Sequence, residues 1–117
     1  MVTMESIMKT EIDPQKAVDF IRDNASKYAQ AKANRVHLEE FRKSKKALLF
    51  QDAPEGTIAD RESFAYGHPD YIELLEGLKA AVEQEETLRW QIEAARLRTE
   101  IWRTQSANDR ALDWVAR

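Results

Sequence analysis

Residues 53–70 read Ala-Pro-Glu-Gly-Thr-Ile-Ala-Asp-Arg-Glu-Ser-Phe-Ala-Tyr-Gly-His-Pro-Asp, and they interrupt a chain that elsewhere holds few helix-breaking residues. The stretch contains two of the three prolines and two of the three glycines in the 117-residue sequence. Proline and glycine together punctuate helices. We therefore expect two breaks, one near residues 53–57 and one near residues 67–69.

The segment between the two breaks predicts a short helix. Thr57 followed three residues later by Asp60 is typical of a capping box, in which two side chains satisfy the free N–H groups of a helix start. Gly67 suits the left-handed position that closes many helices. The short helix is expected to end at Gly67 in that conformation.

The segment before the bend, residues 13–52, predicts one long helix. Asp13 can cap the first free N–H groups, and Pro14 is tolerated at the first helical position. No further proline or glycine appears until Pro54. An apolar series steps by threes and fours, which is a helical period: Val18, Ile21, Ala25, Tyr28, Leu38, Phe41 and Leu48.

The segment after the bend predicts a second long helix that begins at His68-Pro69-Asp70. Its inward series alternates steps of four and three over more than four heptads, as in a coiled coil: Leu74, Leu78, Ala81, Glu85, Leu88, Ile92, Ala95, Thr99, Trp102 and Ser106, widened by Tyr71, Leu75 and Val82. Neither helix can bury its stripe alone, so the two must pack together.

The expected fold is therefore all-α, a long antiparallel helical hairpin, coiled-coil-like, with a short helix at the bend. Residues 1–12 are expected to be an N-terminal tail, and residues 13–117 a single helical-hairpin domain. With the bend near residue 60, the numbers of facing residues sum to roughly 120. This register places Arg35 opposite Glu85, the one charged residue inside the second stripe.

Composition agrees with a helical protein. Apolar residues make up 43% of the chain and charged residues 33%, which is too apolar for a disordered chain and too poor in turn residues for a β-protein. The absence of cysteine excludes disulfides and thiolate metal sites. No signal peptide is evident, and no apolar run approaches the ~20 residues of a membrane helix. We expect a soluble protein of a bacterial cytoplasm, without contact to a membrane.

Catalytic motifs are not evident in this sequence. Cysteine nucleophiles, a Gly-x-Ser-x-Gly elbow and a glycine-rich phosphate loop are all missing. We expect no enzyme activity and no cofactor. His37-x-x-Glu40, with acids at 83, 85 and 86 on the facing helix, has some features of a carboxylate metal site. The alternative is a solvated charged face, since the paired Glu-x-x-His motifs of such sites are missing.

The basic run Arg42-Lys43-Ser44-Lys45-Lys46 is the sharpest polar feature of the chain. Residues 13–52 carry nine Lys or Arg against six acids, whereas residues 70–88 carry one against six. Such a cluster can neutralise phosphates and bind nucleic acid without reading its sequence, although a solvated helix face looks the same. The candidate nucleic-acid-binding residues are Lys32, Arg42, Lys43, Lys45 and Lys46.

Three tryptophans recur every twelve residues, at 90, 102 and 114, so they cannot all face one partner helix. Trp102 belongs to the inward series. The others, with neighbouring apolar residues, predict an oligomer or partner interface: Trp90, Leu97, Ile101, Leu112, Trp114 and Val115. Self-association, with a dimer favoured, would complete a helical bundle. Packing against the short helix, or against Val2, Met4, Ile7 and Met8 of the tail, is the alternative.

Three segments carry a resemblance to a known group of proteins: residues 27–49 (KYAQAKANRVHLEEFRKSKKALL), residues 65–71 (AYGHPDY) and residues 88–90 (LRW). The sequence resembles small all-helical proteins of tailed phages and prophages that are encoded near recombination and replication genes. The resemblance covers most of the chain from residue 13 onward. It implies a setting in DNA metabolism of an infected bacterium, and it supplies no catalytic residues.

Two functional interpretations remain open. The first is a non-enzymatic, homo-oligomeric accessory or adaptor protein that binds a protein partner in phage DNA recombination or replication. The second is a nucleic-acid-binding module that uses the basic face of the first long helix.

Overall fold

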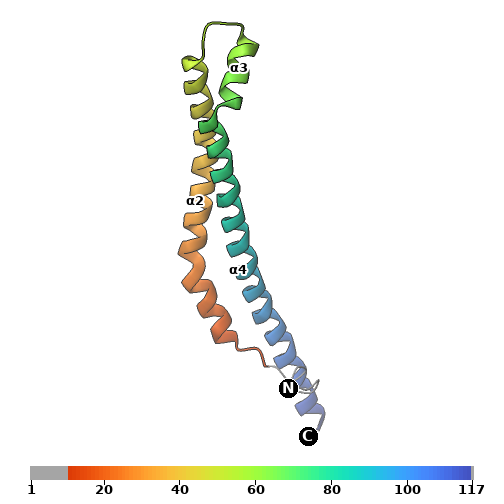
Figure 1. Ribbon diagram of the computed structural model, residues 1–117. Helices are drawn as coiled ribbons and strands as arrows, with labels where there is room; N and C mark the ends of the chain where they lie inside the picture. The colour runs from red at the N-terminus through yellow and green to blue at the C-terminus, as the bar shows by residue number, and fades with distance from the viewer. Residues whose placement is uncertain (1–10, 117) are drawn as a thin grey trace, which may run out of the picture. The chain divides into compact units, whose positions relative to one another are not determined.

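The computed structural model describes residues 11–116, which form three helices and no strand. These helices are α2 (Pro14–Asp52), α3 (Ile58–Gly67) and α4 (Pro69–Ala116) (Figure 1). The predicted all-α helical hairpin with a short helix at its bend is confirmed. The tail predicted for residues 1–12 lies outside the described residues except for its last two, and so do its four apolar side chains.

The helix starts are built by the caps that the sequence predicts. At the start of α2, the Asp13 carboxylate accepts hydrogen bonds from the N–H groups of Gln15 at 2.9 Å and Lys16 at 3.2 Å. At the start of α3, the Thr57 hydroxyl accepts from the Asp60 N–H at 3.1 Å, and the Asp60 carboxylate accepts from the Thr57 N–H at 3.3 Å. Both caps satisfy donors that have no partner within their own helix.

The second break is tighter than predicted and differs in conformation. The α3 helix ends at Gly67 as expected, but no described glycine has a positive φ, so the left-handed cap is wrong. Only His68 separates α3 from α4, and its backbone is extended, with φ −66° and ψ 136°. The physical reason is Pro69, because a proline ring clashes with a helical conformation in the residue before it.

A small apolar cluster holds α3 against the ends of the long helices. Leu49, Ala65 and Tyr71 are buried together, and Phe50 packs against them. The Arg61 guanidinium lies 4.6 Å from the centre of the Phe50 ring, and it donates a hydrogen bond to the Phe50 carbonyl at 2.9 Å. The same carbonyl also accepts from the Ala53 N–H at 3.3 Å, so the turn after α2 and the side chain from α3 both close the end of α2.

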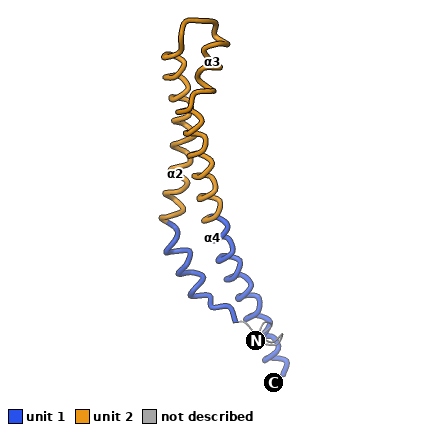
Figure 2. Tube along the Cα trace, in the orientation of Figure 1, with its two compact units in different colours: residues 1–25, 89–117 blue, residues 26–88 orange. Residues whose placement is uncertain are grey.

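The chain divides into two compact units, and both long helices contribute to each of them (Figure 2). Residues 26–88 form one unit, which contains α3 and the apolar cluster at the bend. The other unit combines residues 1–25 with 89–117, and among its described residues Ala17 and Ala95 are the buried ones. That residues 13–117 form a single domain stays a prediction.

The inward face of α4 follows the predicted series. Glu85 and Ala95 are buried, and the other members are half-buried apart from Trp102, whose exposed fraction is 41%. Tyr71 is also buried, whereas Leu75 and Val82 are exposed at the edge of the face. The alternation of four and three residues therefore identified the correct side of this helix.

The inward face of α2 differs from the prediction. Val18, Ala25, Phe41 and Leu48 are exposed. Ten of the buried and half-buried positions instead follow their own alternation of four and three: Ala17, Ile21, Asn24, Tyr28, Ala31, Arg35, Leu38, Arg42, Lys45 and Leu49. Small side chains let two helix backbones approach closely, and long basic side chains bury their stems while their charged ends find partners. Ile21, Tyr28 and Leu38 therefore lie on the inward face as predicted, whereas hydrophobicity alone placed the other four residues there wrongly.

Candidate functional site

An ion pair crosses the hairpin at the predicted position. The Arg35 guanidinium donates two hydrogen bonds to the Glu85 carboxylate, one from Nε to Oε2 and one from Nη2 to Oε1 at 3.0 Å. A third bond runs from Nη1 to Glu39 at 3.0 Å. The Glu85 carboxylate, and after it Glu39, raises the pKa of Arg35 above its ordinary value. The predicted register is confirmed here, and this pair has a structural role.

Three of the five candidate nucleic-acid-binding residues contact other side chains of the unit formed by residues 26–88. Lys43 pairs with Glu40 on its own helix at 3.4 Å, and Lys45 reaches Asp70 of α4 at 3.7 Å. Arg42 is half-buried on the inward face, and Lys32 is exposed farther along α2. The basic run is therefore divided between the inward face and the solvent, and it does not present five free cations.

Two tyrosines that the sequence interpretation missed complete a basic and aromatic pocket near the bend. The pocket has a volume of about 440 Å³, and its lining consists of Arg42, Lys43, Lys46, Tyr66 and Tyr71. The Lys46 ammonium lies 4.5 Å from the centre of the Tyr66 ring, and contact with this phenol raises the pKa of Lys46. Tyr66 meets Tyr71 edge to face at 5.4 Å. Tyr66 belongs to α3 and Tyr71 to α4, so the pocket depends on both elements lying beside the end of α2.

Three of the five residues considered for a metal site have other partners. Glu85 pairs with Arg35, and Glu40 pairs with Lys43. The His37 ring stacks on Phe41 with 6.0 Å between ring centres. Within residues 11–116 no three His, Asp or Glu side chains are grouped so that they could hold a metal ion.

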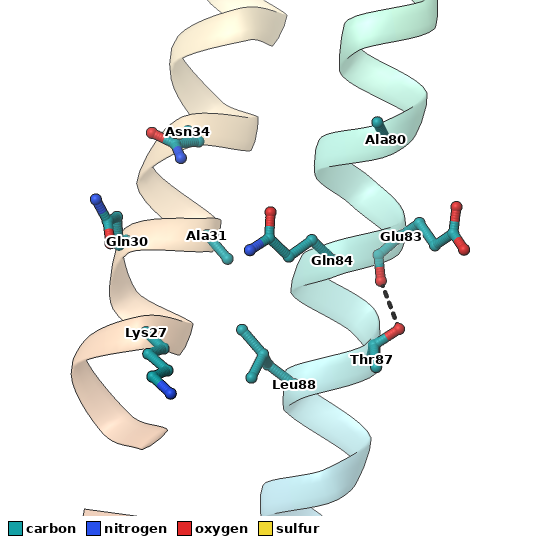
Figure 3. A pocket seen from close by; sticks show the side chains of 9 residues that line it. All are labelled: Lys27, Gln30, Ala31, Asn34, Ala80, Glu83, Gln84, Thr87 and Leu88. Carbon is teal, nitrogen blue, oxygen red and sulfur yellow. Dashed lines mark hydrogen bonds between the residues drawn. The ribbon is translucent and has the colours of Figure 1, made fainter. Parts of the chain in front are cut away.

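A groove of about 460 Å³ lies between α2 and α4 inside the unit of residues 26–88 (Figure 3). Gln84 and Leu88 of α4 point toward α2, and Ala31 points back toward them. The Thr87 hydroxyl donates to the Glu83 carbonyl at 2.8 Å on the same helix. Amide and small side chains dominate the remaining lining: Lys27, Gln30, Asn34 and Ala80. The groove offers hydrogen-bonding groups without a nucleophile and base in contact.

The predicted interface residues are all strongly exposed: Trp90, Leu97, Ile101, Leu112, Trp114 and Val115. A helix turns by about 100° per residue, so all of them except Trp114 fall within a sector of about 60° on α4. Trp114 lies roughly 100° beyond the edge of that sector. The structure therefore gathers five of the six side chains on one helix face, which we call the outer face of α4.

Charged residues flank the outer face. The Arg96 guanidinium donates to Glu93 at 2.6 Å and 3.2 Å, and to Glu100 at 2.6 Å. The hydrogen bond from Arg96 holds the pKa of Glu93 below its ordinary value, and Glu93 in turn raises the pKa of Arg96. The network is solvent-exposed, so its contribution to stability is small.

No family model, curated protein or solved structure matches this chain. None of the helices within residues 11–116 is both long and apolar enough to span a bilayer.

Proposed function

We propose that this protein is a non-enzymatic, homo-oligomeric helical accessory protein that acts by binding other proteins. The observation that carries the proposal is the outer face of α4, where five large apolar side chains are exposed along one side of one helix. Apolar side chains gathered on a surface mark interaction sites, and tryptophan is enriched among the residues that dominate binding energy.

Self-association is tested by light scattering of the full chain over a range of concentrations. One chain has a mass of 13.6 kDa. We expect the measured mass to rise toward twice this value with concentration. A mass of one chain at the highest concentration that stays in solution would refute self-association.

The protein partner that we propose belongs to the recombination or replication machinery of a phage or prophage. The resemblance of residues 27–49 to small phage proteins supports this setting. The test uses the full chain as bait in lysate from phage-infected cells, with a Leu97→Glu variant as the matched control. We expect a recombination or replication protein to be retained by the native bait and lost from the variant. Retention by both baits would place the binding site elsewhere.

Nucleic-acid binding is a second candidate function, and the basic and aromatic pocket near the bend favours it. Lys43 and Lys46 can approach phosphates, and Tyr66 offers a ring on which a base can stack. Both features lie within one pocket, as expected for a single-stranded ligand. The acidic segment of residues 70–88 opposes this function by repelling phosphates.

The test for this candidate is a filter-binding assay with single-stranded and double-stranded DNA and with RNA at low and moderate salt. Binding through phosphates must weaken steeply as salt rises. Replacing Lys43, Lys45 and Lys46 together with Glu should abolish it. Because Lys45 does not line the pocket and pairs with Asp70 of another helix, the Lys43→Glu/Lys46→Glu double variant is the sharper probe. Lys27→Glu, a change on the same helix outside this pocket, should leave binding unchanged.

A further inference from the structure

A second heptad series runs along the outer face of α4. Eight positions alternate steps of four and three residues, and all eight are exposed. The large residues of the outer face occupy four of them, and small or polar residues occupy the others. We call this series the outer stripe: Trp90, Ala94, Leu97, Ile101, Thr104, Asn108, Ala111 and Val115.

The outer stripe lies opposite the inward face of the same helix. Each of its members from 94 to 108 follows a member of the inward series by two residues, as Leu97 follows Ala95 and Ile101 follows Thr99. Two residues turn a helix by about 200°. α4 therefore carries one coiled-coil stripe toward the hairpin and another away from it.

The residue types on the outer stripe favour two parallel strands. In heptad notation, a and d are the core positions; Ile101 and Val115 are β-branched residues at a, and Leu97 is at d. Within parallel coiled coils, β-branched residues at a with leucine at d favour two strands over three or four. Asn108 also occupies an a position, where a single asparagine fixes register and limits the number of strands. The Thr104 hydroxyl donates to the Glu100 carbonyl at 3.2 Å, which leaves its methyl group for packing.

The charges beside the stripe complement those of a second copy in the same orientation. With Ala94 at position a, Glu93 occupies position g and Arg98 occupies position e. In parallel coiled coils a residue at g of one helix pairs with the residue at e, five positions later, of the other helix. Two such Glu–Arg pairs form in a parallel, in-register dimer. In an antiparallel pair that packs the same outer stripe, with Ala94 opposite Ala111, Glu93 would face Trp114 and Arg98 would face Gln105. Arg96 keeps its bond to Glu100 when Glu93 turns toward the second copy.

We propose that a second copy of this chain occupies the outer face of α4, with the two helices parallel and in register over residues 90–115. The proposal rests on the self-association proposed above and specifies its surface and direction. Asn108 of each copy faces its equivalent, and Glu93 of each copy pairs with Arg98 of the other.

The surface is tested with two matched variants of the full chain. Ile101→Glu places a charge on the outer stripe, and Ile72→Glu makes the same change at an equally exposed site elsewhere on α4, since the exposed fractions are 48% and 49%. We expect Ile101→Glu to raise the dimer dissociation constant by roughly 30-fold or more, as for loss of a dominant interface residue. Ile72→Glu should leave it unchanged. Circular dichroism should show that both variants remain helical.

The direction of pairing is tested by disulfide cross-linking, because the chain has no cysteine of its own. Equivalent a positions face each other in a parallel pair, within reach of a disulfide. Ala94→Cys should therefore cross-link to a dimer under mild oxidation. Ala33→Cys, exposed on α2, is the control and should not. In an antiparallel pair Ala94 faces Ala111 instead, so only chains carrying cysteine at both positions would link efficiently.

The outcomes separate this proposal from the one on which it rests. A native protein that stays monomeric overturns both. A native dimer that tolerates Ile101→Glu overturns the surface proposed here and leaves self-association standing. A dimer that Ile101→Glu disrupts, but that cross-links only when cysteines occupy both positions 94 and 111, overturns the parallel direction. Disruption together with cross-linking through position 94 alone supports the proposal.

Discussion

Two adjacent leucines near the end of α2 provide a test of which helix face is buried. Leu49 is 5% exposed and packs in the cluster with Ala65 and Tyr71, whereas Leu48 is 52% exposed. Replacing each of them with alanine removes the same atoms from the same helix. Any gain in helix propensity is therefore shared, and the difference between the variants reports burial.

The magnitude follows from the surroundings of each side chain. Leucine to alanine in a packed core costs about 2 to 5 kcal/mol, and less where neighbours can close the space. Leu49 has few neighbours in a small cluster, so we expect about 2.5 kcal/mol for Leu49→Ala. Leu48 already has half of its surface in water, so Leu48→Ala should cost about 0.5 kcal/mol or less.

The assay is urea unfolding followed by circular dichroism at one fixed protein concentration, because self-association would add to the apparent stability. The slope of free energy against urea should match the native value in both variants, so that the midpoint alone reports the change. A difference between the two variants smaller than about 0.5 kcal/mol, or a larger loss for Leu48→Ala, would refute the inward face described for α2.

Three further predictions concern the ion pair, the cap and the end of α4. Arg35→Met should lower the urea midpoint more than Glu85→Gln does, because it leaves a buried carboxylate without its guanidinium; equal losses would contradict this asymmetry. Thr57→Ala should cost about 1 kcal/mol in thermal or urea unfolding, with Thr57→Ser as the control, since serine caps equally well; no loss would mean that the cap contributes nothing. Truncation after Asn108 removes the last two positions of the outer stripe and should weaken self-association while helicity of the remaining chain persists. A truncated chain that sediments like the full chain would show that these residues take no part in the interface.

Local signals in the sequence predict the helix boundaries well, since caps and prolines act on the residues beside them. Thr57 and Asp60 form the expected cap. The sequence predicts the position of Gly67 correctly but not its conformation, because Pro69 forces an extended backbone on His68 and this residue makes the break.

The buried face of a helix can be predicted from the sequence only where the buried positions are also the apolar ones. They coincide on α4, but on α2 the inward positions include Arg35, Arg42 and Lys45. The hairpin register predicts the Glu85 partner of Arg35, whereas the Asp70 partner of Lys45 lies beside the bend, where that register gives no prediction. The same limit applies to the basic pocket. Its cations were predictable from the run itself, whereas the position of Tyr66 depends on how α3 folds back.

The alanines at the deepest positions of the described chain have an evolutionary consequence. Ala17, Ala31, Ala65 and Ala95 are nearly inaccessible, while five large apolar side chains of α4 are exposed on its outer face. The positions that specify the hairpin are therefore almost separate from those available to a partner. Substitutions on the outer face can change what the chain binds without disturbing its fold. Among related chains we expect the alanines and the Arg35–Glu85 pair to change slowly, and the outer face to diverge together with its partner.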